Sequence, residues 1–290
     1  GFASTETFRR SAFFAGPVLA AVLIELHPAF TVSFRYVLAV GVVGGAVGTV
    51  VQHVLYDASE DTLGSSFAGL EQVRADLREM PSELRPLLIG DTLVRFANGM
   101  VYVFFVLVVT RFYEIGFDAT VSFGGDTYAV SVSPAAFFGY LLGVEMLIAL
   151  LTMVPAAKVA ERVGLKPIVS LGFLVYGAFP VVLIYGPDLL APAVPLQWAM
   201  VLLFAFSGLR FAGLPSHKAL IVGPAAQDAG GRVTGTYYLL RNTVVIPSAA
   251  IGGYLWEFVS PELAFSIAAV VGVAGTGYFF VFGTEFEAYQ

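Results

Sequence analysis

The residues best suited to chemistry in this sequence are charged side chains placed inside apolar segments. Four such segments each carry a charged residue near their middle or inner part. These residues are Arg95, Glu145, Arg210 and Arg241. A lone charge at the centre of a bilayer costs at least about 2.5 kcal/mol, so such residues persist where they face a partner or water. The pattern therefore predicts side chains that border a path for a solute or an ion.

Glu145 is the acid of this group, and it lies near the midplane of its segment. Its carboxyl could exchange a proton or change partners as access alternates, and the alternative is a permanent ion pair with Arg210 or Arg241. The two arginines would be counter-ions of Glu145 or anchors for an anionic substrate, unless they only join helices through backbone carbonyls. Two bases against one acid favour an anionic or carboxylate-bearing ligand.

A stripe of polar residues runs along the segment that contains Arg95. Asp91, Arg95, Asn98 and Tyr102 follow one another at helical spacing, so they share one face of a helix. Asp91 and Arg95 can pair within the helix near its cytoplasmic end, and Asn98 and Tyr102 lie deeper and can offer hydrogen bonds to a solute. The alternative is a packing seam between helices. His217 ends a similar stripe near the cytoplasmic surface, where we expect it to be solvated.

Other chemistries find little support in the sequence. It has no cysteine, its three histidines lie far apart, and no basic cluster suggests nucleic acid. No paired metal motif, nucleophile elbow or phosphate-binding glycine loop is present. We therefore expect no metal, no cofactor and no enzymatic activity, and we keep a polytopic membrane enzyme as the less favoured alternative.

The elements that must position these residues are membrane helices. The chain is 58% hydrophobic and 12% charged, with a mean hydropathy of +0.83, whereas globular proteins are about a quarter charged. A bilayer core needs about 20 apolar residues per helix, and membrane β-strands would be about half as long. The sequence predicts an all-α membrane protein with eight spans: 8–26, 34–56, 87–111, 134–156, 167–186, 195–221, 233–256 and 262–283.

The positively charged residues of the short loops predict the orientation. With a cytoplasmic start, the outer side receives only Arg35 and Arg111, and both chain ends face the cytoplasm. The inner side receives Arg74, Arg78, Arg85, Lys158, Arg162, Lys166, Lys218 and Arg232.

Two connections carry patterns of their own. Residues 57–86 repeat apolar side chains at helical spacing, which predicts an amphipathic helix at the membrane surface; a mobile acidic linker is the alternative. Residues 115–132 are rich in Val, Phe, Tyr and Thr around Gly124-Gly125, which is compatible with a small hairpin.

The loop after the fourth span resembles a family signature. It contains A-K-V-A-E-R-V-G-L-K-P, which is similar to the loop G-x-L-A-D-R-x-G-R-K-P of the major facilitator superfamily of secondary transporters. Glu161 stands at the acidic position, Arg162 and Lys166 at basic positions, and Gly164 at the tight turn. The resemblance implies a gating loop, and we place Asp91 in the same gating group.

The loop departs from the family pattern at three positions. Ala157 replaces the first glycine, Glu161 replaces aspartate, and Leu165 replaces the first residue of the Arg-Lys pair. Two further stretches resemble the family: Pro215 to Gly235 is similar to its connection between the tenth and eleventh helices. Gly16 and Pro17 belong to a stretch whose small residues are spaced as in the antiporter motif of the family's fifth helix.

The resemblance implies that the eight spans are helices five to twelve of the twelve-helix fold. Residues 1–56 would be the last two helices of the N-terminal half, 57–86 the cytoplasmic linker, and 87–290 the C-terminal half. Since the chain begins with Gly1 and shows no signal peptide, we expect a truncated start that lacks the first four helices. In the family, helices six, nine and twelve face lipid.

The resemblance also implies the function. We expect a multi-pass protein of the cell membrane that moves a small solute by alternating access, with proton-coupled efflux by antiport as the preferred mode and proton-coupled uptake by symport as the alternative. Its expected partners are the solute, protons, the lipid bilayer and the N-terminal helices.

Overall fold

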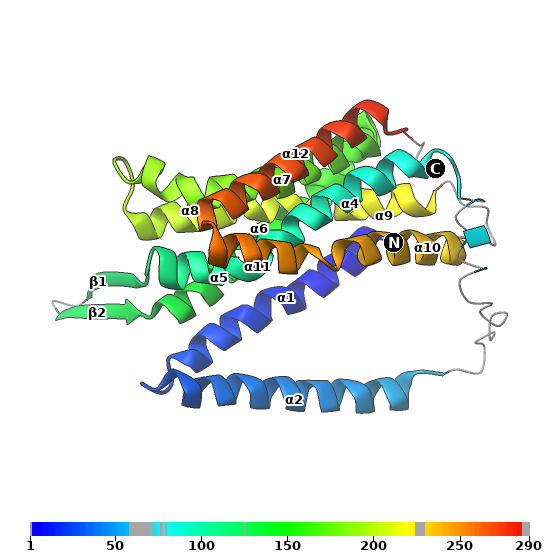
Figure 1. The fold of residues 1–290 in the computed structure, drawn as a ribbon. Helices are drawn as coiled ribbons and strands as arrows, with labels where there is room; N and C mark the ends of the chain where they lie inside the picture. The colour runs from blue at the N-terminus through cyan, green and yellow to red at the C-terminus, as the bar shows by residue number, and fades with distance from the viewer. Residues whose placement is uncertain are drawn as a thin grey trace.

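The computed structural model is a bundle of helices with a two-stranded hairpin at one end (Figure 1). It describes residues 2–57, 80–123, 126–223 and 230–285, together with isolated positions between 71 and 78. Both chain termini lie toward the end of the bundle away from the hairpin. The main helices are α1 (Phe2–Ile24), α2 (Phe30–Leu55), α4 (Leu84–Val101), α6 (Pro134–Val163), α7 (Leu165–Leu190), α8 (Leu196–Gly208), α9 (Leu214–Val222), α10 (Gly230–Val245), α11 (Ser248–Phe258) and α12 (Pro261–Phe282).

Short irregular turns extend two of these helices. After α4 come the 3₁₀ turn η1 (Tyr102–Phe104), the short helix α5 (Phe105–Leu107) and the π turn η2 (Val108–Phe112). Between α8 and α9 lies the 3₁₀ turn η3 (Leu209–Phe211). Both interruptions fall at residues that line the cavity described below.

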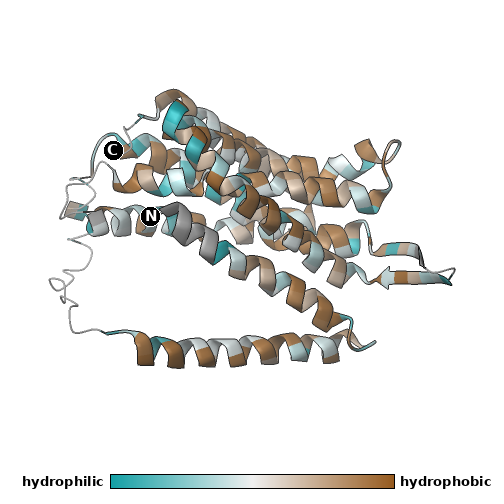
Figure 2. Ribbon diagram, turned by 180° about the vertical axis from the view of Figure 1, so that it is seen from behind, coloured by the Kyte–Doolittle hydropathy of each residue, from teal (hydrophilic) through white to brown (hydrophobic). Residues whose placement is uncertain are grey.

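The chain is a helical membrane protein by the length and composition of its helices. Apolar residues extend along the whole bundle (Figure 2), and many large hydrophobic side chains are exposed on its surface. Within the described part of the chain, six segments are long and apolar enough to cross a bilayer: Phe30–Leu55, Leu84–Phe112, Pro134–Val163, Leu165–Leu190, Leu196–Val222 and Pro261–Phe282.

The two remaining expected spans are helical but do not belong to these six. Residues 8–26 fall largely in α1, and residues 233–256 fall in α10 and α11. The latter pair is divided at Ile246–Pro247, because proline lacks the N–H that a continuous helix would use. Each piece is shorter than the about 20 residues that a span requires.

The helix boundaries follow from local chemistry. Ser133 and Ser260 precede α6 and α12, and each side-chain oxygen accepts a hydrogen bond from the backbone N–H three residues later. Pro134 and Pro261 occupy the first helical position, where a missing N–H costs nothing. Gly164 has a φ of +92°, which allows α6 and α7 to meet in a tight turn.

Close helix crossings in the C-terminal part depend on glycine. Gly177 of α7 faces Gly272 of α12, and a Cβ on Gly272 would lie 2.6 Å from the Gly177 Cα. Gly90 of α4 and Gly275 of α12 form a second such crossing, where a Cβ on Gly90 would lie 2.9 Å from the Gly275 carbonyl oxygen. These contacts bring α4 and α7 against α12.

Helix α7 corrects one expectation. The segment 167–186 was expected to face lipid as the family's ninth helix does, but α7 is the most buried of the six apolar segments. It packs on α4, α8, α9 and α12. Its aromatic side chains Phe173, Tyr176 and Phe179 fill the space between these helices, which is why they are buried.

The N-terminal helices meet the rest of the bundle through α1. Gly139 and Gly143 of α6 lie against α1, and a Cβ on Gly139 would be 2.9 Å from the Pro17 carbonyl oxygen. Helix α2 begins beside the end of α1 and then runs apart from the C-terminal helices (Figure 1). Ser33 anchors the turn between α1 and α2 by donating to the His27 carbonyl oxygen at 2.9 Å.

The predictions for the two connections, residues 115–132 and 57–86, have different outcomes. The hairpin is confirmed: β1 (Phe117–Phe123) pairs antiparallel with β2 (Asp126–Val132), with Phe117 opposite Val132. The amphipathic helix expected within 57–86 lies almost wholly outside the described residues.

Candidate solute site

A buried ion pair stands at the centre of the candidate site. Glu145 Oε1 lies 2.7 Å from Arg210 Nη2, and the two side chains are 1% and 2% exposed. Ser207 donates its hydroxyl hydrogen to the same carboxylate oxygen. The expected contact between Glu145 and Arg210 is therefore present, and it joins α6 to the junction of α8 and α9.

The sequence around Arg210 positions this pair. Gly208 allows the end of α8 to lie against α6, since a Cβ there would be 2.5 Å from the Glu145 carbonyl oxygen. Arg210 then lies in η3, and Gly213 and Pro215 mark the start of α9. The 3₁₀ turn interrupts the regular helix at the residue that carries the charge.

Aromatic rings surround the Arg210 guanidinium. Its central carbon lies 4.8–5.9 Å from the ring centroids of Tyr102, Phe105, Tyr176, Phe179 and Phe211. Rings at this distance attract a cation through their electron-rich faces. Nε and Nη1 of Arg210 are buried, and within the described part of the chain neither has a hydrogen-bond partner.

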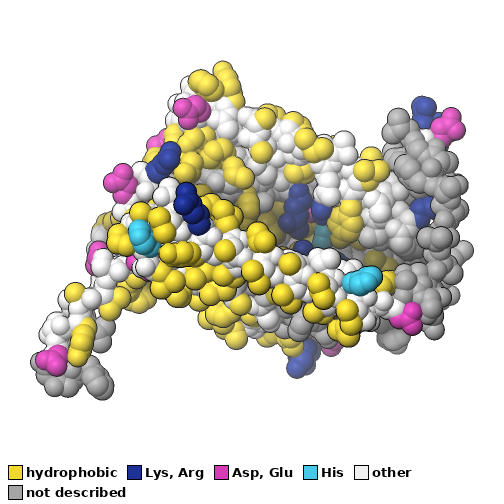
Figure 3. Space-filling model, turned by 90° about the horizontal axis from the view of Figure 1, so that it is seen from below, with side chains coloured by type: hydrophobic (Ala, Val, Ile, Leu, Met, Phe, Trp, Pro, Cys, Tyr) yellow, Lys and Arg dark blue, Asp and Glu magenta, His cyan; other side chains and the backbone are white. Residues whose placement is uncertain are grey.

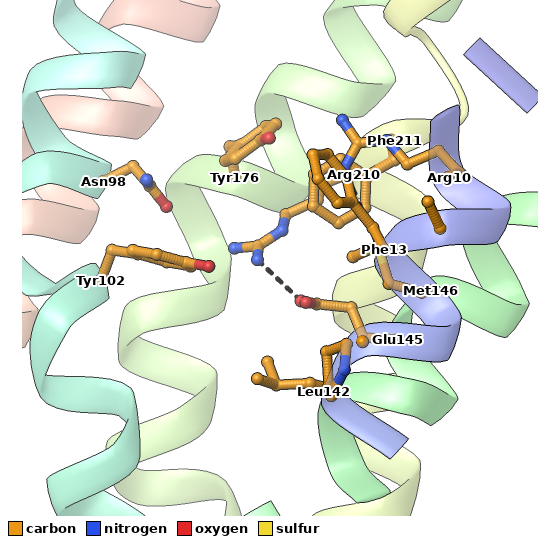
Figure 4. Close-up of a pocket in the computed structure, with 13 residues that line it drawn as sticks. Arg10, Phe13, Asn98, Tyr102, Leu142, Glu145, Met146, Tyr176, Arg210 and Phe211 are labelled. Atoms are coloured by element: carbon orange, nitrogen blue, oxygen red, sulfur yellow. Dashed lines mark hydrogen bonds and ion pairs between the residues drawn. The ribbon is translucent and has the colours of Figure 1, made fainter. Parts of the chain in front are cut away.

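The pair borders a cavity of about 370 Å³ between α1 and the C-terminal helices. In Figure 4, Arg210 lies between Tyr102 and Glu145, and Arg10 and Phe13 approach from α1. Figure 3 shows a hollow on one face of the bundle with Lys or Arg side chains at its floor. The lining residues are Arg10, Ala12, Phe13, Gly16, Pro17, Asn98, Tyr102, Leu142, Glu145, Met146, Tyr176, Arg210 and Phe211.

A second ionic cluster is centred on Asp91 of α4. Asp91 is fully buried, and its Oδ2 lies 2.9 Å from Arg241 Nη1 and 3.2 Å from His217 Nε2. Its Oδ1 accepts from Arg95 Nε at 3.1 Å, which confirms the pairing expected within the helix. Tyr237 donates its hydroxyl hydrogen to Oδ2 at 3.0 Å. The cluster ties α4 to α9 and α10.

Two sequence-based expectations are corrected by this cluster. Arg241 was expected to be a counter-ion of Glu145 or a substrate anchor at the same site, and it pairs instead with Asp91. His217 was expected to be solvated near the surface, but its side chain is 4% exposed because it packs between Phe173, Tyr237 and Asp91. The charge of Asp91 explains why both groups turn inward.

The remaining expected solute residues fall on the cavity or beside it. Asn98 and Tyr102 line it, as their position on the α4 stripe predicts. Arg95 does not line it; its guanidinium carbon lies 4.6 Å from the centroid of Tyr176, a ring that does. Arg95 is thus one side chain away from the cavity.

Asp91 lies apart from the other expected gating residues, Glu161, Arg162, Gly164 and Lys166, which stand at the turn between α6 and α7. Glu161 and Arg162 are exposed at the end of α6, whereas Asp91 belongs to the buried cluster above. The acid that contacts the start of α7 is Glu285, which follows α12 in the chain. Its carboxylate accepts hydrogen bonds from the backbone N–H groups of Leu165 and Lys166 at 2.7 and 2.9 Å. An anion at a helix N-terminus is stabilised by the exposed N–H groups.

Sequence reasoning missed several contributors to these sites. Arg10 lines the cavity, with its guanidinium carbon 4.2 Å from the centroid of Phe211. Tyr176 and Tyr237 contribute a ring wall and a hydroxyl donor. The signal for Arg10 was its position six residues before Gly16-Pro17 on an apolar helix. Glu285 follows α12 and carries no pattern that would connect it to α7.

No protein-family model matches the chain, and no curated protein matches its sequence. Among the described side chains, no group of three or more His, Asp or Glu residues is placed to hold a metal ion.

Proposed function

We propose that the protein is a secondary transporter of the major facilitator type, which moves a small solute across the cell membrane by alternating access coupled to protons. The observation that carries the proposal is the buried pair of Glu145 and Arg210 at the border of a cavity. Charges are retained in apolar helices where they serve a solute or ion path.

The proposal includes the arrangement of helices. α1 and α2 correspond to the family's fifth and sixth helices, and the six segments from α4 onward correspond to its C-terminal half, with α10 and α11 together forming one interrupted span. Interrupted helices at a central site are typical of secondary transporters. Both ends of the chain face the cytoplasm in this arrangement.

Proton coupling is assigned to Glu145. In the preferred mode, export by antiport, the solute and the proton occupy the Glu145 site in alternation. Gly16 and Pro17, which resemble the antiporter motif, line the same cavity and support this mode.

Uptake by symport is the second candidate, and a specific contact favours it. Glu145 is held by Arg210. A solute that takes Arg210 from Glu145 leaves the carboxyl group free to accept a proton, so solute and proton would bind together.

The test is proton-driven flux by the full-length protein in proteoliposomes across a panel of compounds. We expect Glu145→Gln to lose gradient-driven accumulation at least tenfold while solute exchange without a gradient continues, because glutamine keeps hydrogen bonding but cannot carry the proton. Glu257→Gln, at an exposed glutamate of α11, is the matched control and should behave like wild type. Gradient-driven flux in Glu145→Gln equal to wild type would contradict the coupling assignment.

A further inference from the structure

We propose that the cavity binds an uncharged solute, which has an apolar or aromatic body and a neutral polar group such as an amide or a hydroxyl. The polar group would form hydrogen bonds with Asn98 and Tyr102, and the body would lie against the wall formed by α1 and α6. The inference rests on the proposed transport function, because it names the class of solute that would be carried.

The first argument is that the ion pair at the border of the cavity is already complete. Arg241 pairs with Asp91, so Glu145 and Arg210 remain as one acid and one base, and both are almost fully buried. Nε and Nη1 of Arg210, the nitrogens that do not hold Glu145, are buried as well. A charged solute would have to separate this pair to use either partner, and separation leaves an uncompensated buried charge.

Arg10, the other charged residue of the described lining, is engaged by neighbouring side chains. Its guanidinium carbon lies 4.2 Å from the ring centroid of Phe211 and 5.2 Å from that of Phe13. Its Nη1 lies 3.7 Å from the Met146 sulfur. These contacts hold the side chain between α1, α6 and η3, and the electron-rich faces of the two rings attract its charge. Arg10 is therefore a packed part of the wall.

The polar groups that the cavity offers to a solute are neutral. Asn98 and Tyr102 line it from α4 and the turn that follows, and both project toward Arg210 in Figure 4. They are four residues apart, which places them on the same face of the helix, and Tyr102 is 49% exposed. A side-chain amide and a phenol hydroxyl can each donate and accept a hydrogen bond. Together they suit the amide or hydroxyl group of an uncharged solute.

Most of the remaining described wall is apolar. Phe13 of α1 and Leu142 and Met146 of α6 lie across the cavity from the two polar residues (Figure 4). Ligand pockets are lined mainly by apolar and aromatic side chains and commonly measure about 300–1,000 Å³. The volume of about 370 Å³ therefore suits a small molecule whose body is a single ring or a short apolar chain.

A solute bound in this way leaves the Glu145–Arg210 pair in place. This agrees with antiport as the preferred mode, because the symport route described above needs a solute that takes Arg210 from Glu145. An uncharged solute carries no charge to balance that of the proton. Exchange of the two therefore moves net charge across the membrane, and flux should respond to the membrane potential.

The experiment measures binding to the purified full-length protein in detergent by calorimetry at neutral pH. The probes are sets of compounds that share one body and differ in charge, such as 3-phenylpropanamide, 3-phenyl-1-propanol, 3-phenylpropionate and 3-phenylpropylammonium. We expect at least one neutral compound to bind tenfold or more tightly than both charged members of its set.

Two variants test the polar contacts. Tyr102→Phe and Asn98→Ala should each weaken binding of that neutral compound at least threefold, because each removes a hydrogen bond to the solute. Tyr254→Phe, at an exposed tyrosine of α11, is the matched control and should bind the compound like wild type.

Three outcomes would overturn the inference. They are a charged compound that binds as tightly as the neutral members of its set, a panel from which no neutral compound binds, and full affinity in either Tyr102→Phe or Asn98→Ala. If a variant fails to fold, the affinity ratio between neutral and charged compounds decides. Proton-driven flux of charged compounds without binding of neutral ones would remove this inference and leave the transport function standing, whereas binding of neutral compounds without any flux would do the reverse.

Discussion

Each of the two buried acids among the described residues, Asp91 and Glu145, contacts basic side chains. Asp91 has contacts with Arg95, His217 and Arg241, and Glu145 has contacts with Arg210 and Ser207. Removing one partner from a buried group leaves the others with an uncompensated charge, which costs more than the pair itself contributes. The two clusters differ in access, because among the described residues Glu145 and Arg210 line the cavity of about 370 Å³ and Asp91 does not.

The Asp91 cluster should therefore be mainly a stabilising contact between helices. Asp91→Asn is expected to lower the free energy of unfolding by about 3 kcal/mol, since Arg95 and Arg241 would lose their shared acid. Thermal unfolding in detergent measures the effect. The exposed Glu257→Gln should change stability by less than about 0.5 kcal/mol. Equal stability of both variants would show that Asp91 is not the centre of the cluster.

Residue types were easier to anticipate than partners. Periodicity placed Asn98 and Tyr102 on one helical face, and both line the cavity. Arg241 was assigned to the wrong acid because the sequence gives its depth along a helix but not the direction in which the helix faces. Glu285 was missed for the same reason: its contact with the start of α7 depends on where α12 ends in space.

At the scale of elements, the cavity lies at interruptions of helix geometry. Tyr102 begins the 3₁₀ turn after α4, and Arg210 lies within the 3₁₀ turn between α8 and α9. Irregular turns inside helices commonly mark hinges. Within the proposed transport cycle, these two turns are where α4 and α8 would bend as the cavity changes its open side.

The crossings of α12 are expected to be rigid in comparison. Gly272→Ala should destabilise the protein by about 1–3 kcal/mol, because the new methyl group would meet the backbone of Gly177. Gly277→Ala on the same helix has nothing within 4 Å among the described atoms and should be neutral or slightly stabilising. Unfolding midpoints of the two variants provide the comparison, and equal midpoints would mean that α7 and α12 do not cross there.

Helices and their approximate limits could be predicted because apolar segments and proline or glycine breaks are local signals. The burial of α7 could not, since it depends on neighbours that are distant in sequence, whereas the interruption at Ile246–Pro247 has a local cause in the proline. The lipid-facing role expected for α7 came from the family pattern and not from its own residues.

At the scale of the whole molecule, the orientation in the membrane can be tested directly. The turn at the end of α6 and the hairpin before α6 lie at opposite ends of that helix. The chain has no cysteine, so single cysteines report accessibility without interference. An impermeant thiol reagent should label Thr127→Cys in intact cells and Glu161→Cys only in inverted vesicles. Labelling of both from one side would refute the proposed orientation.

The central claim is that Glu145 and Arg210 border a water-filled path through the membrane. The most direct measurement is the reaction of a single cysteine on the cavity wall, Asn98→Cys, with an impermeant thiol reagent in membranes. Val270→Cys, at a 70% exposed position on the outer face of α12, is the control. We predict rapid labelling at position 98 that a bound solute suppresses, and no labelling at position 270. Equal reactivity at the two positions, or none at position 98, would contradict it.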